Sequence, residues 1–206
     1  MTSPWQAAEP PIILASASVA RISLLEAAGL TFEARAAAVD EAALKGSAHA
    51  DGLSPADTAI ALAELKAQRV ARTRPEALVI GCDQLLVCGD IWFDKPANAA
   101  EARVQLQSLR GRRHTLVTAV VCWRGNGHIW HHVAQPNLTM RDLSDTFIDV
   151  YLAAEGDAVT TTVGAYRMEG LGAQLFDAIT GEHAAILGLP LLPLLGFLRQ
   201  HGVLMR

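Results

Sequence analysis

Two residues that could take part in catalysis, an aspartate and a lysine, lie in the stretch of residues 77–96. The apolar run 78–80 is typical of a short buried strand, and Gly81 predicts that this strand stops at a tight turn. Asp83 would then follow the end of a buried strand, where a carboxylate can hold a metal ion or orient a water molecule. Lys95 offers a cation in a loop that the following proline stiffens. The alternative is a plain hairpin, with Asp83 in its turn and Lys95 in solvent.

Two serines and an arginine follow the first predicted strand, residues 11–15. Ser16 and Ser18 open a helical pattern, and Arg21 falls in its first turn. Backbone N–H groups, the positive end of the helix dipole and a guanidinium then surround one point, which is typical of an anion site. The alternative is that Ser18 is a simple helix cap and Arg21 is solvated.

Three further charged residues are candidates for a functional site. Asp40 and Glu41 close a second predicted extended segment, residues 30–39, and a predicted loop follows at 45–53. One of these carboxylates could reach a divalent cation, or both could lie in solvent at a turn. Lys66 lies among alanines on a well-capped predicted helix, so that it either points inward or extends to the surface.

Composition limits the class of protein. The chain has 206 residues, of which 51% are hydrophobic and 18% charged, so it predicts a folded single domain over residues 10–206 behind a frayed polar leader at 1–9. A formal net charge of -4 gives no general attraction to nucleic acid. Three cysteines without metal-ligand spacing predict reduced thiols and a cytoplasmic protein, and no segment is long and apolar enough to predict a membrane span.

Strand and helix patterns alternate early in the chain, and a long hairpin lies in its middle. The hairpin is predicted at residues 114–123 and 129–140, joined by a glycine-rich turn. This order predicts an α/β fold with a mixed sheet. Three histidines, His128, His131 and His132, lie on the second arm, but adjacent histidines on a strand point to opposite faces, which disfavours a metal site there.

Eight short motifs follow one another in an order that points to one family. They are Ser16-Ala17-Ser18 with Arg21, Asp40-Glu41, Leu62-Ala63 with Lys66-Ala67, Gly81-Cys82-Asp83-Gln84, Lys95-Pro96, Gly111-Arg112 with His114, Gly164-Ala165-Tyr166, and Gly188-Leu189-Pro190. In order and spacing, from about Pro11 to Gly202, the chain resembles the Maf family of nucleoside triphosphate pyrophosphatases.

This resemblance implies a fold and an activity. The expected fold is like that of the ITP pyrophosphatases, an α/β structure whose mixed, twisted sheet curls around a deep cleft. The expected reaction is hydrolysis of a nucleoside triphosphate between the α and β phosphates, giving a monophosphate and pyrophosphate, with a divalent metal such as Mg, Mn or Co. A house-cleaning role in nucleotide metabolism follows from the same resemblance.

The resemblance also implies roles for individual residues. Asp83 matches the family's catalytic carboxylate, and Lys66 and Lys95 match cations that hold the phosphate chain. Ser16, Ser18 and Arg21 belong to the motif that gives the family its anion loop. Glu41 matches an acid close to the metal, which Asp83 would share.

Three positions bear on the choice of nucleotide: Ala20, Gln84 and Glu169. Gln84 and Glu169 resemble the branch of the family that acts on 7-methyl-GTP, and Glu169 could accept hydrogen bonds from the N1–H and amine of a guanine ring. The chain departs from that branch at Ala20 and Ile22, where an aromatic residue and a second arginine are usual. Losing the aromatic residue removes a stacking platform for a cationic base. The sequence thus favours a purine and leaves the 7-methyl group open.

A second class of function stays open at this point. Members of the family have been discussed as regulators of septum formation, so the chain could bind nucleotides with little turnover. Retention of Asp83, Lys66 and Lys95 favours the enzyme, because binding alone needs no base. The predicted partner is a nucleoside triphosphate, not nucleic acid or a membrane, and the apolar hairpin arms allow a homodimer.

Overall fold

A computed structural model describes residues 3–206, and the chain packs in them as two compact units. Unit 1 holds the chain up to Asp83, together with Thr118–Ala134 and Leu187–Arg206. Unit 2 holds Gln84–Val117 and Gln135–Ile186. Strands β3 and β5 each begin in one unit and end in the other, so the units share covalently continuous strands. A single domain over residues 10–206 stays a prediction.

The strands found in residues 3–206 form one mixed sheet with the order β2-β1-β3-β5-β7-β8, in which β4 also pairs with β3 and β6 with β5. Strand β1 is parallel to β2 and β3, whereas β4, β6, β7 and β8 pair antiparallel. The strands are β1 Ile12–Leu14, β2 Glu33–Ala34, β3 Leu78–Cys88, β4 Ile91–Phe93, β5 Arg113–Arg124, β6 Gly127–Ala134, β7 Asn137–Met140 and β8 Phe176–Thr180. The α/β class and the mixed sheet are therefore confirmed, and a deep cleft stays a prediction.

The helices lie between and after groups of these strands along the chain. They are α1 Val19–Ala27, α2 Glu41–Ala50, α3 Pro55–Ala71, α4 Ala99–Leu109, α5 Asp145–Glu155, α6 His183–Ile186 and α7 Leu191–Gln200, with 3-10 helices η1 Gly156–Thr161, η2 Val163–Ala165 and η3 Leu171–Leu175. Within unit 2, α4 and α5 pack against each other and against η1, in an apolar core that Leu106, Leu109 and Ile148 help to form.

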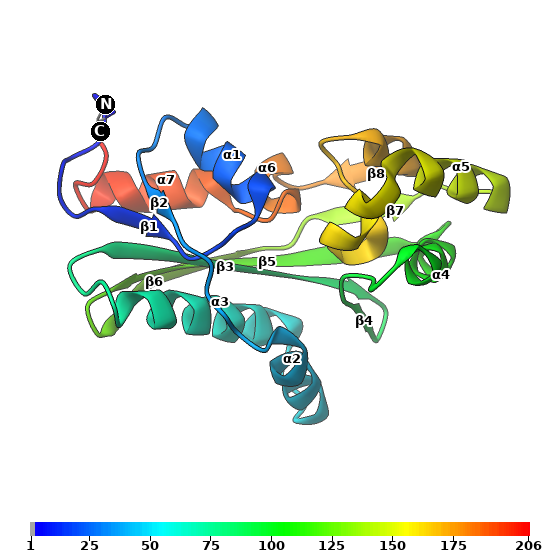
Figure 1. Cartoon of the computed structure of the whole chain (residues 1–206), viewed down its shortest axis with the longest axis horizontal. Helices are drawn as coiled ribbons and strands as arrows, with labels where there is room; N and C mark the ends of the chain where they lie inside the picture. Colours follow the sequence, from blue (N-terminus) through cyan, green and yellow to red (C-terminus); the bar gives the residue numbers. More distant parts are fainter. Residues whose placement is uncertain (1–2) are drawn as a thin grey trace. The chain divides into compact units, whose positions relative to one another are not determined.

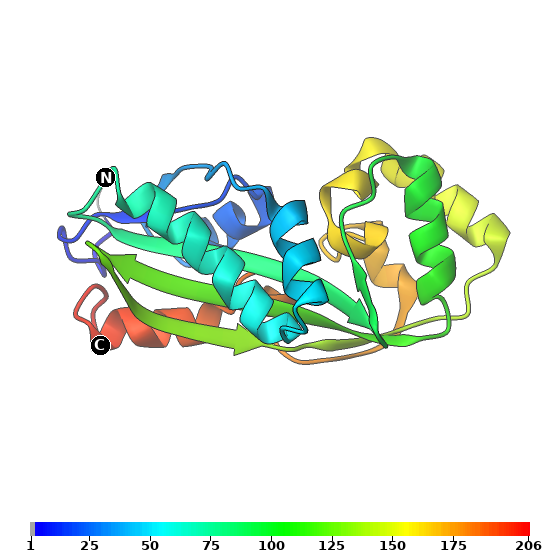
Figure 2. The same cartoon turned by 90° about the horizontal axis from the view of Figure 1, so that it is seen from below.

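Alternation along β3 decides what each face of unit 1 contacts. Figures 1 and 2 show α1 and α7 on one face of the sheet and α3 on the other. Leu78, Ile80 and Cys82 belong to the core that includes α1 and α7. Val79 packs instead in the core that α3 completes. Since successive side chains of a strand point to opposite faces, Asp83 lies on the same face as Val79, beneath α3.

Gly81 lets α3 approach the sheet closely. A Cβ added at Gly81 would lie 2.1 Å from the carbonyl oxygen of Ala63 and 2.9 Å from the Cβ of Ala67. The prediction that the strand stops at Gly81 is wrong, because β3 continues as Leu78–Cys88. The glycine serves helix-to-strand contact and not a turn.

The segment between β1 and α3 also differs from its prediction. The extended segment expected at residues 30–39 is reduced to Glu33–Ala34, and α2 occupies much of the loop expected at 45–53. Asp40 explains the helix, because its side chain accepts a hydrogen bond from the backbone N–H of Ala43 and so caps the first turn. The small polar residues of this segment favour a loop, but the capping hydrogen bond of Asp40 stabilises a helix there instead.

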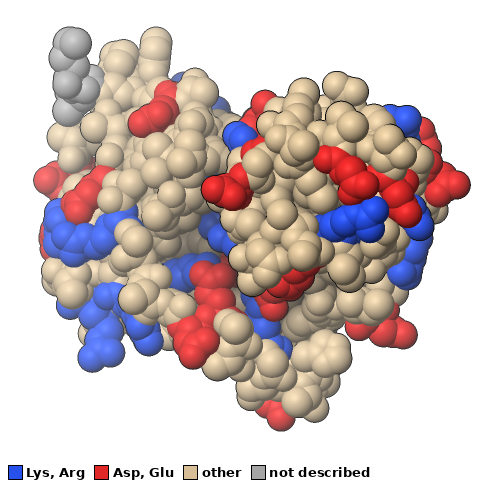
Figure 3. All heavy atoms as spheres, turned by 45° about the vertical axis from the view of Figure 1, so that its right-hand side comes forward, with Lys and Arg blue, Asp and Glu red and all other residues tan. Residues whose placement is uncertain are grey.

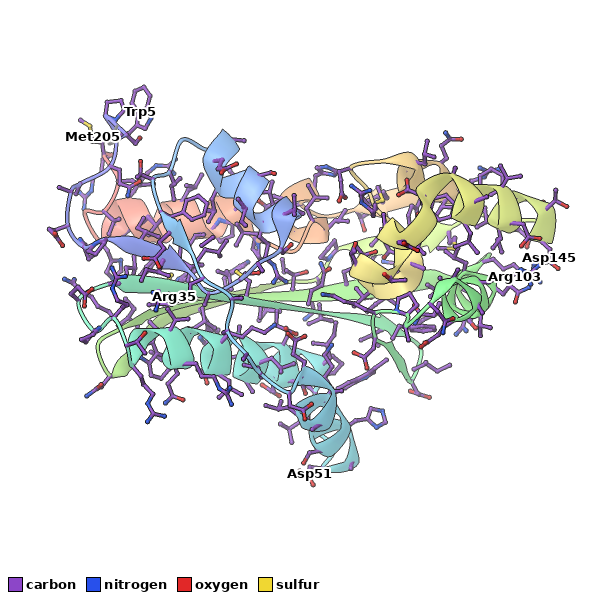
Figure 4. All side chains as sticks on the ribbon, viewed as in Figure 1. Trp5, Arg35, Asp51, Arg103, Asp145 and Met205 are labelled. Atoms are coloured by element: carbon purple, nitrogen blue, oxygen red, sulfur yellow. The ribbon has the colours of Figure 1, made fainter. Side chains whose placement is uncertain are left out.

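The two ends of the described chain lie together in unit 1. Gln6 forms a β-bridge with Leu204, and Met205 donates its backbone N–H to the carbonyl of Trp5. Figure 4 shows the Trp5 and Met205 side chains next to each other. The leader predicted at residues 1–9 thus makes backbone hydrogen bonds in its described part, and residues 1 and 2 lie outside the described residues.

We expect Gly81→Ala to destabilise the protein by about 1–3 kcal/mol, because the new methyl group overlaps the backbone of α3. Urea unfolding followed by circular dichroism measures this. The matched control is Gly46→Ala on exposed α2, where an added Cβ meets nothing within 4 Å and should stabilise the helix by about 0.5–1 kcal/mol. Equal stability of Gly81→Ala and wild type would contradict the close packing.

Candidate active site

Lys66 joins two carboxylates in unit 1. Its Nζ lies 2.6 Å from Oδ1 of Asp83 and 2.7 Å from Oε1 of Glu41. Asp83 is 2% exposed and Lys66 7%, so this is a buried ion pair with Glu41 at its more open edge. Of the alternatives left open by the sequence, Lys66 points inward and Asp83 lies within a buried strand. Glu41 faces this pair from the first turn of α2.

The second carboxylate oxygen of Asp83 has no hydrogen-bond partner although it is buried. A buried carboxylate oxygen without a partner is costly, which is a feature typical of sites that complete themselves with a ligand. Together with Glu41 it supplies the oxygen donors that Mg²⁺ or Mn²⁺ prefers. Within residues 3–206 no group of three or more His, Cys, Asp or Glu is arranged to hold a metal. The two carboxylates therefore fit a cation that takes its other ligands from water and phosphate.

Arg21 ties three distant segments of unit 1 together. Its Nε donates to the carbonyl of Gly188 at 2.8 Å, and its Nη1 donates to Oγ of Ser16 at 3.3 Å and to the carbonyl of Cys82 at 3.2 Å. The guanidinium thus contacts the residue next to Asp83. Gly188 is required here, because its φ is +98° and an added Cβ would lie 3.0 Å from Nε of Arg21.

The serines form the turn that leads into α1. Ser18 is the N-cap residue, but its side chain makes no capping hydrogen bond, and its backbone N–H donates to Oγ of Ser16 at 3.2 Å. Ser16 is 9% exposed and Ser18 is half-buried. Ala20 lies half-buried in the first turn of α1, one position before Arg21. Unit 1 therefore brings the predicted anion loop to the strand that carries Asp83.

The remaining predicted site residues belong to unit 2. Lys95 is exposed in the loop after β4. Gln84 follows Asp83 in β3, and its Nε2 donates to the carbonyls of Ala185 and Ile186 at 3.0 and 3.1 Å. This contact fixes the Gln84 side chain against α6. Convergence of Lys95 with Asp83 on one phosphate chain stays a prediction, and so does the role of Gln84 in base preference.

Glu169 lies in a loop that a buried acid organises. Arg167 pairs with Glu169 at 3.3 Å and with Glu155 at 3.4 Å, and Glu155 also accepts the backbone N–H of Leu171 at 3.1 Å. The Glu155 side chain is only 6% exposed. Sequence reasoning missed Glu155, because an acid in the last turn of a helix usually faces solvent. The structure makes it the residue that positions the Glu169 loop.

His114 and Tyr166 form a buried polar pair in unit 2. Nε2 of His114 lies 2.9 Å from the Tyr166 hydroxyl, and both residues are nearly inaccessible to solvent. Burial lowers the pKa of His114 from 6.5 to about 4 and raises that of Tyr166 well above its usual value. Both residues occur in the motifs of the family resemblance, and this contact gives them a structural role.

The cysteines are buried and unpaired, as expected. Burial raises the pKa of Cys82 to about 11 and also raises that of Cys122. A thiolate is the reactive form of cysteine, so these two residues are unsuited to act as nucleophiles.

We expect His114 to make the protein less stable as the pH falls. The unfolded chain binds a proton at His114 near pH 6.5, whereas the folded protein binds it only near pH 4. The free energy of unfolding should thus fall between these values, by up to about 3 kcal/mol from this residue. Urea unfolding at several pH values measures the slope.

His114→Gln keeps a hydrogen-bonding partner for Tyr166 and should remove that part of the slope. His183→Gln, at an exposed histidine, is the control and should keep it. The same slope in His114→Gln and wild type would show that His114 is not held neutral.

Comparisons with known proteins agree with the motifs. The family model described as Maf-like protein matches residues 11–201. A nucleoside triphosphate pyrophosphatase of Granulibacter bethesdensis is 56% identical, over 94% of this chain and 98% of its own. A nucleoside triphosphate pyrophosphatase of Rhodospirillum rubrum is 53% identical, over 95% of this chain and 97% of its own. A 7-methyl-GTP pyrophosphatase of Rhizobium meliloti is 52% identical, over 95% and 98%. The chain belongs to the Maf family.

Proposed function

We propose that this chain is a nucleoside triphosphate pyrophosphatase that cleaves between the α and β phosphates and releases a monophosphate and pyrophosphate. The observation that carries the proposal is the buried Asp83, which has one oxygen on Lys66 and the other without a partner. Relatives that are 52–56% identical over more than nine-tenths of the chain and carry pyrophosphatase names support it. They do not favour the alternative of a regulator with little turnover.

Asp83 acts as the general base in this proposal. Its partnerless oxygen accepts the proton of the attacking water, while Lys66 holds the other oxygen and fixes the orientation of the carboxylate. Because the base takes the proton as the water attacks, hydroxide does not have to form beforehand. Lys66 can also turn toward a phosphate oxygen, because an ammonium group is a compact cation with rotatable donors.

A divalent cation, Mg, Mn or Co, is the proposed cofactor. Its protein ligands would be Glu41 and the Oδ1 atom of Asp83, which becomes available when Lys66 turns toward a phosphate oxygen. When bound, it neutralises charge on the phosphate oxygens. Glu41 is 39% exposed at its side chain, so it can leave Lys66 for a cation without uncovering the core. Asp83, which is fixed in β3, keeps its place.

The phosphate chain is proposed to bind at the anion loop. Ser16 and Ser18 offer hydroxyls beside the N-terminus of α1, and Arg21 holds the loop while adding positive charge. Lys95 is assigned to the same phosphates on the family resemblance. The developing negative charge of the leaving pyrophosphate is then met by cations that are already in place.

Base selection is proposed to rest on Gln84 and Glu169, with Ala20 as the third position. Arg167 and Glu155 hold the Glu169 loop, so the carboxylate is presented on a supported turn. A carboxylate accepts the N1–H and amine of guanine, which a pyrimidine does not offer in that arrangement. The relative from Rhizobium meliloti bears the name 7-methyl-GTP pyrophosphatase, which supports a purine or modified purine as substrate.

The proposed setting is house-cleaning of nucleotides in the cytoplasm. Unpaired buried thiols suit a reducing compartment. No helix within residues 3–206 has the length and apolarity needed to cross a membrane. Acidic and basic side chains are interleaved on the face drawn in Figure 3, which suits a small phosphorylated substrate better than a polyanion. A homodimer is also proposed.

We expect Asp83→Asn to lower turnover by about 10²–10⁴-fold on every nucleotide, because the amide cannot accept the proton. Pyrophosphate release from a panel of purine and pyrimidine triphosphates, with Mg, Mn or Co in turn, measures this. The matched control is Asp90→Asn, at an exposed aspartate in the turn between β3 and β4, which should keep wild-type rates. Full activity of a folded Asp83→Asn protein would overturn the proposed base.

Glu169→Gln should change which base is preferred and leave the chemistry intact. Losing the charged acceptor should reduce the ratio of kcat/KM for purine over pyrimidine substrates by about tenfold or more. The same panel measures the ratio, with Glu26→Gln on exposed α1 as control. An unchanged ratio with an equal loss on every substrate would assign Glu169 to another role.

A further inference from the structure

Strand β6 carries an irregularity that changes where its histidines point. Trp123 pairs with His128, whereas Cys122 pairs with Trp130 and Val121 with His131, so Ile129 is an extra residue in the ladder. In a regular strand, residues 128 and 131 would face opposite sides. The bulge shifts the alternation by one position, and His128 and His131 come to the same face.

The two histidines lie against α3, and their rings are held by contacts. Glu64 of α3 hydrogen-bonds Nδ1 of His128, and Nε2 of His128 lies 3.1 Å from Nδ1 of His131. The His128 side chain is 26% exposed and His131 is exposed. His132 lies on the other face, where its ring stacks on Trp130. The expectation of no metal site on this arm assumed a regular strand, and the bulge brings His128 and His131 to one face.

This arrangement has the spacing of a chelate. Two imidazole nitrogens bound to one tetrahedral Zn²⁺, at about 2.0–2.1 Å each, lie about 3.3 Å apart. Glu64 accepts the Nδ1–H of His128 and so leaves the lone pair of Nε2 directed at His131. A carboxylate that orients a histidine in this way is a recurrent partner of metal-binding imidazoles.

We propose that His128 and His131, positioned by Glu64, bind a borderline divalent transition metal such as Zn²⁺. The cation replaces the hydrogen bond between the two rings, and water supplies the remaining ligands, because residues 3–206 hold no group of three or more ligating side chains. Imidazole nitrogens favour Zn²⁺, Ni²⁺ and Cu²⁺ over Mg²⁺. This proposed site, with its nitrogen ligands, therefore differs in metal preference from the proposed site at Asp83 and Glu41, whose ligands are oxygens.

Calorimetric titration of Zn²⁺ into the full chain at pH 7.5, with saturating Mg²⁺ to hold the carboxylate site, tests the proposal. We expect one Zn²⁺ to bind wild type, and His131→Ala to weaken it at least tenfold. Glu64→Gln should weaken it by about 10- to 100-fold, as for other residues that orient a ligand. His132→Ala is the matched control and should keep wild-type affinity, because its side chain lies on the opposite face.

Histidine NMR gives an independent readout on the same proteins. Zn²⁺ should shift the ring resonances of His128 and His131 and leave those of His132 unchanged. No Zn²⁺ binding to wild type, wild-type affinity in folded His131→Ala, or an equal loss in His132→Ala would each overturn the proposal.

Discussion

The buried ion pair between Lys66 and Asp83 is the interaction on which the rest of unit 1 depends. A charge removed from water costs several kcal/mol, and the attraction between the partners repays this cost only when their geometry is good. The 2.6 Å contact requires α3 to lie almost on β3, and Gly81 permits that approach. Replacing a buried ion pair by well-packed apolar residues is often neutral or stabilising, so stability alone does not explain this pair.

Arg21 holds the segments around that pair in place, because its guanidinium is fixed by hydrogen bonds. Its three hydrogen bonds join the loop before α1, the middle of β3 and the turn before α7. These segments are far apart in the sequence, so local propensity cannot set their positions. A planar guanidinium with several fixed donors suits this task better than a lysine. Arg21 thus supplies both positive charge next to β3 and support for three segments of unit 1.

Capping, alternation and motif order depend on neighbouring residues, and from them the sequence predicted the α/β class. They also singled out Asp83, Lys66 and Glu41, which the structure brings into contact. The sequence could not show that Gly81 lies inside a continuous strand, since a glycine that admits a helix and one that makes a turn look alike. It placed a loop where Asp40 caps α2. Glu155 and the pairing of His128 with His131 escaped notice because they depend on a tertiary contact and on a bulge.

Strand β3 places Asp83 and Gln84 next to each other, although they lie in different units and contact different helices. Adjacent residues of a strand face opposite sides, so adding or removing one residue here would exchange the surroundings of both side chains. A change of length at this junction would therefore take Asp83 from Lys66 and Gln84 from α6 together. Only a side-chain replacement can alter one of these two positions and leave the other as it is.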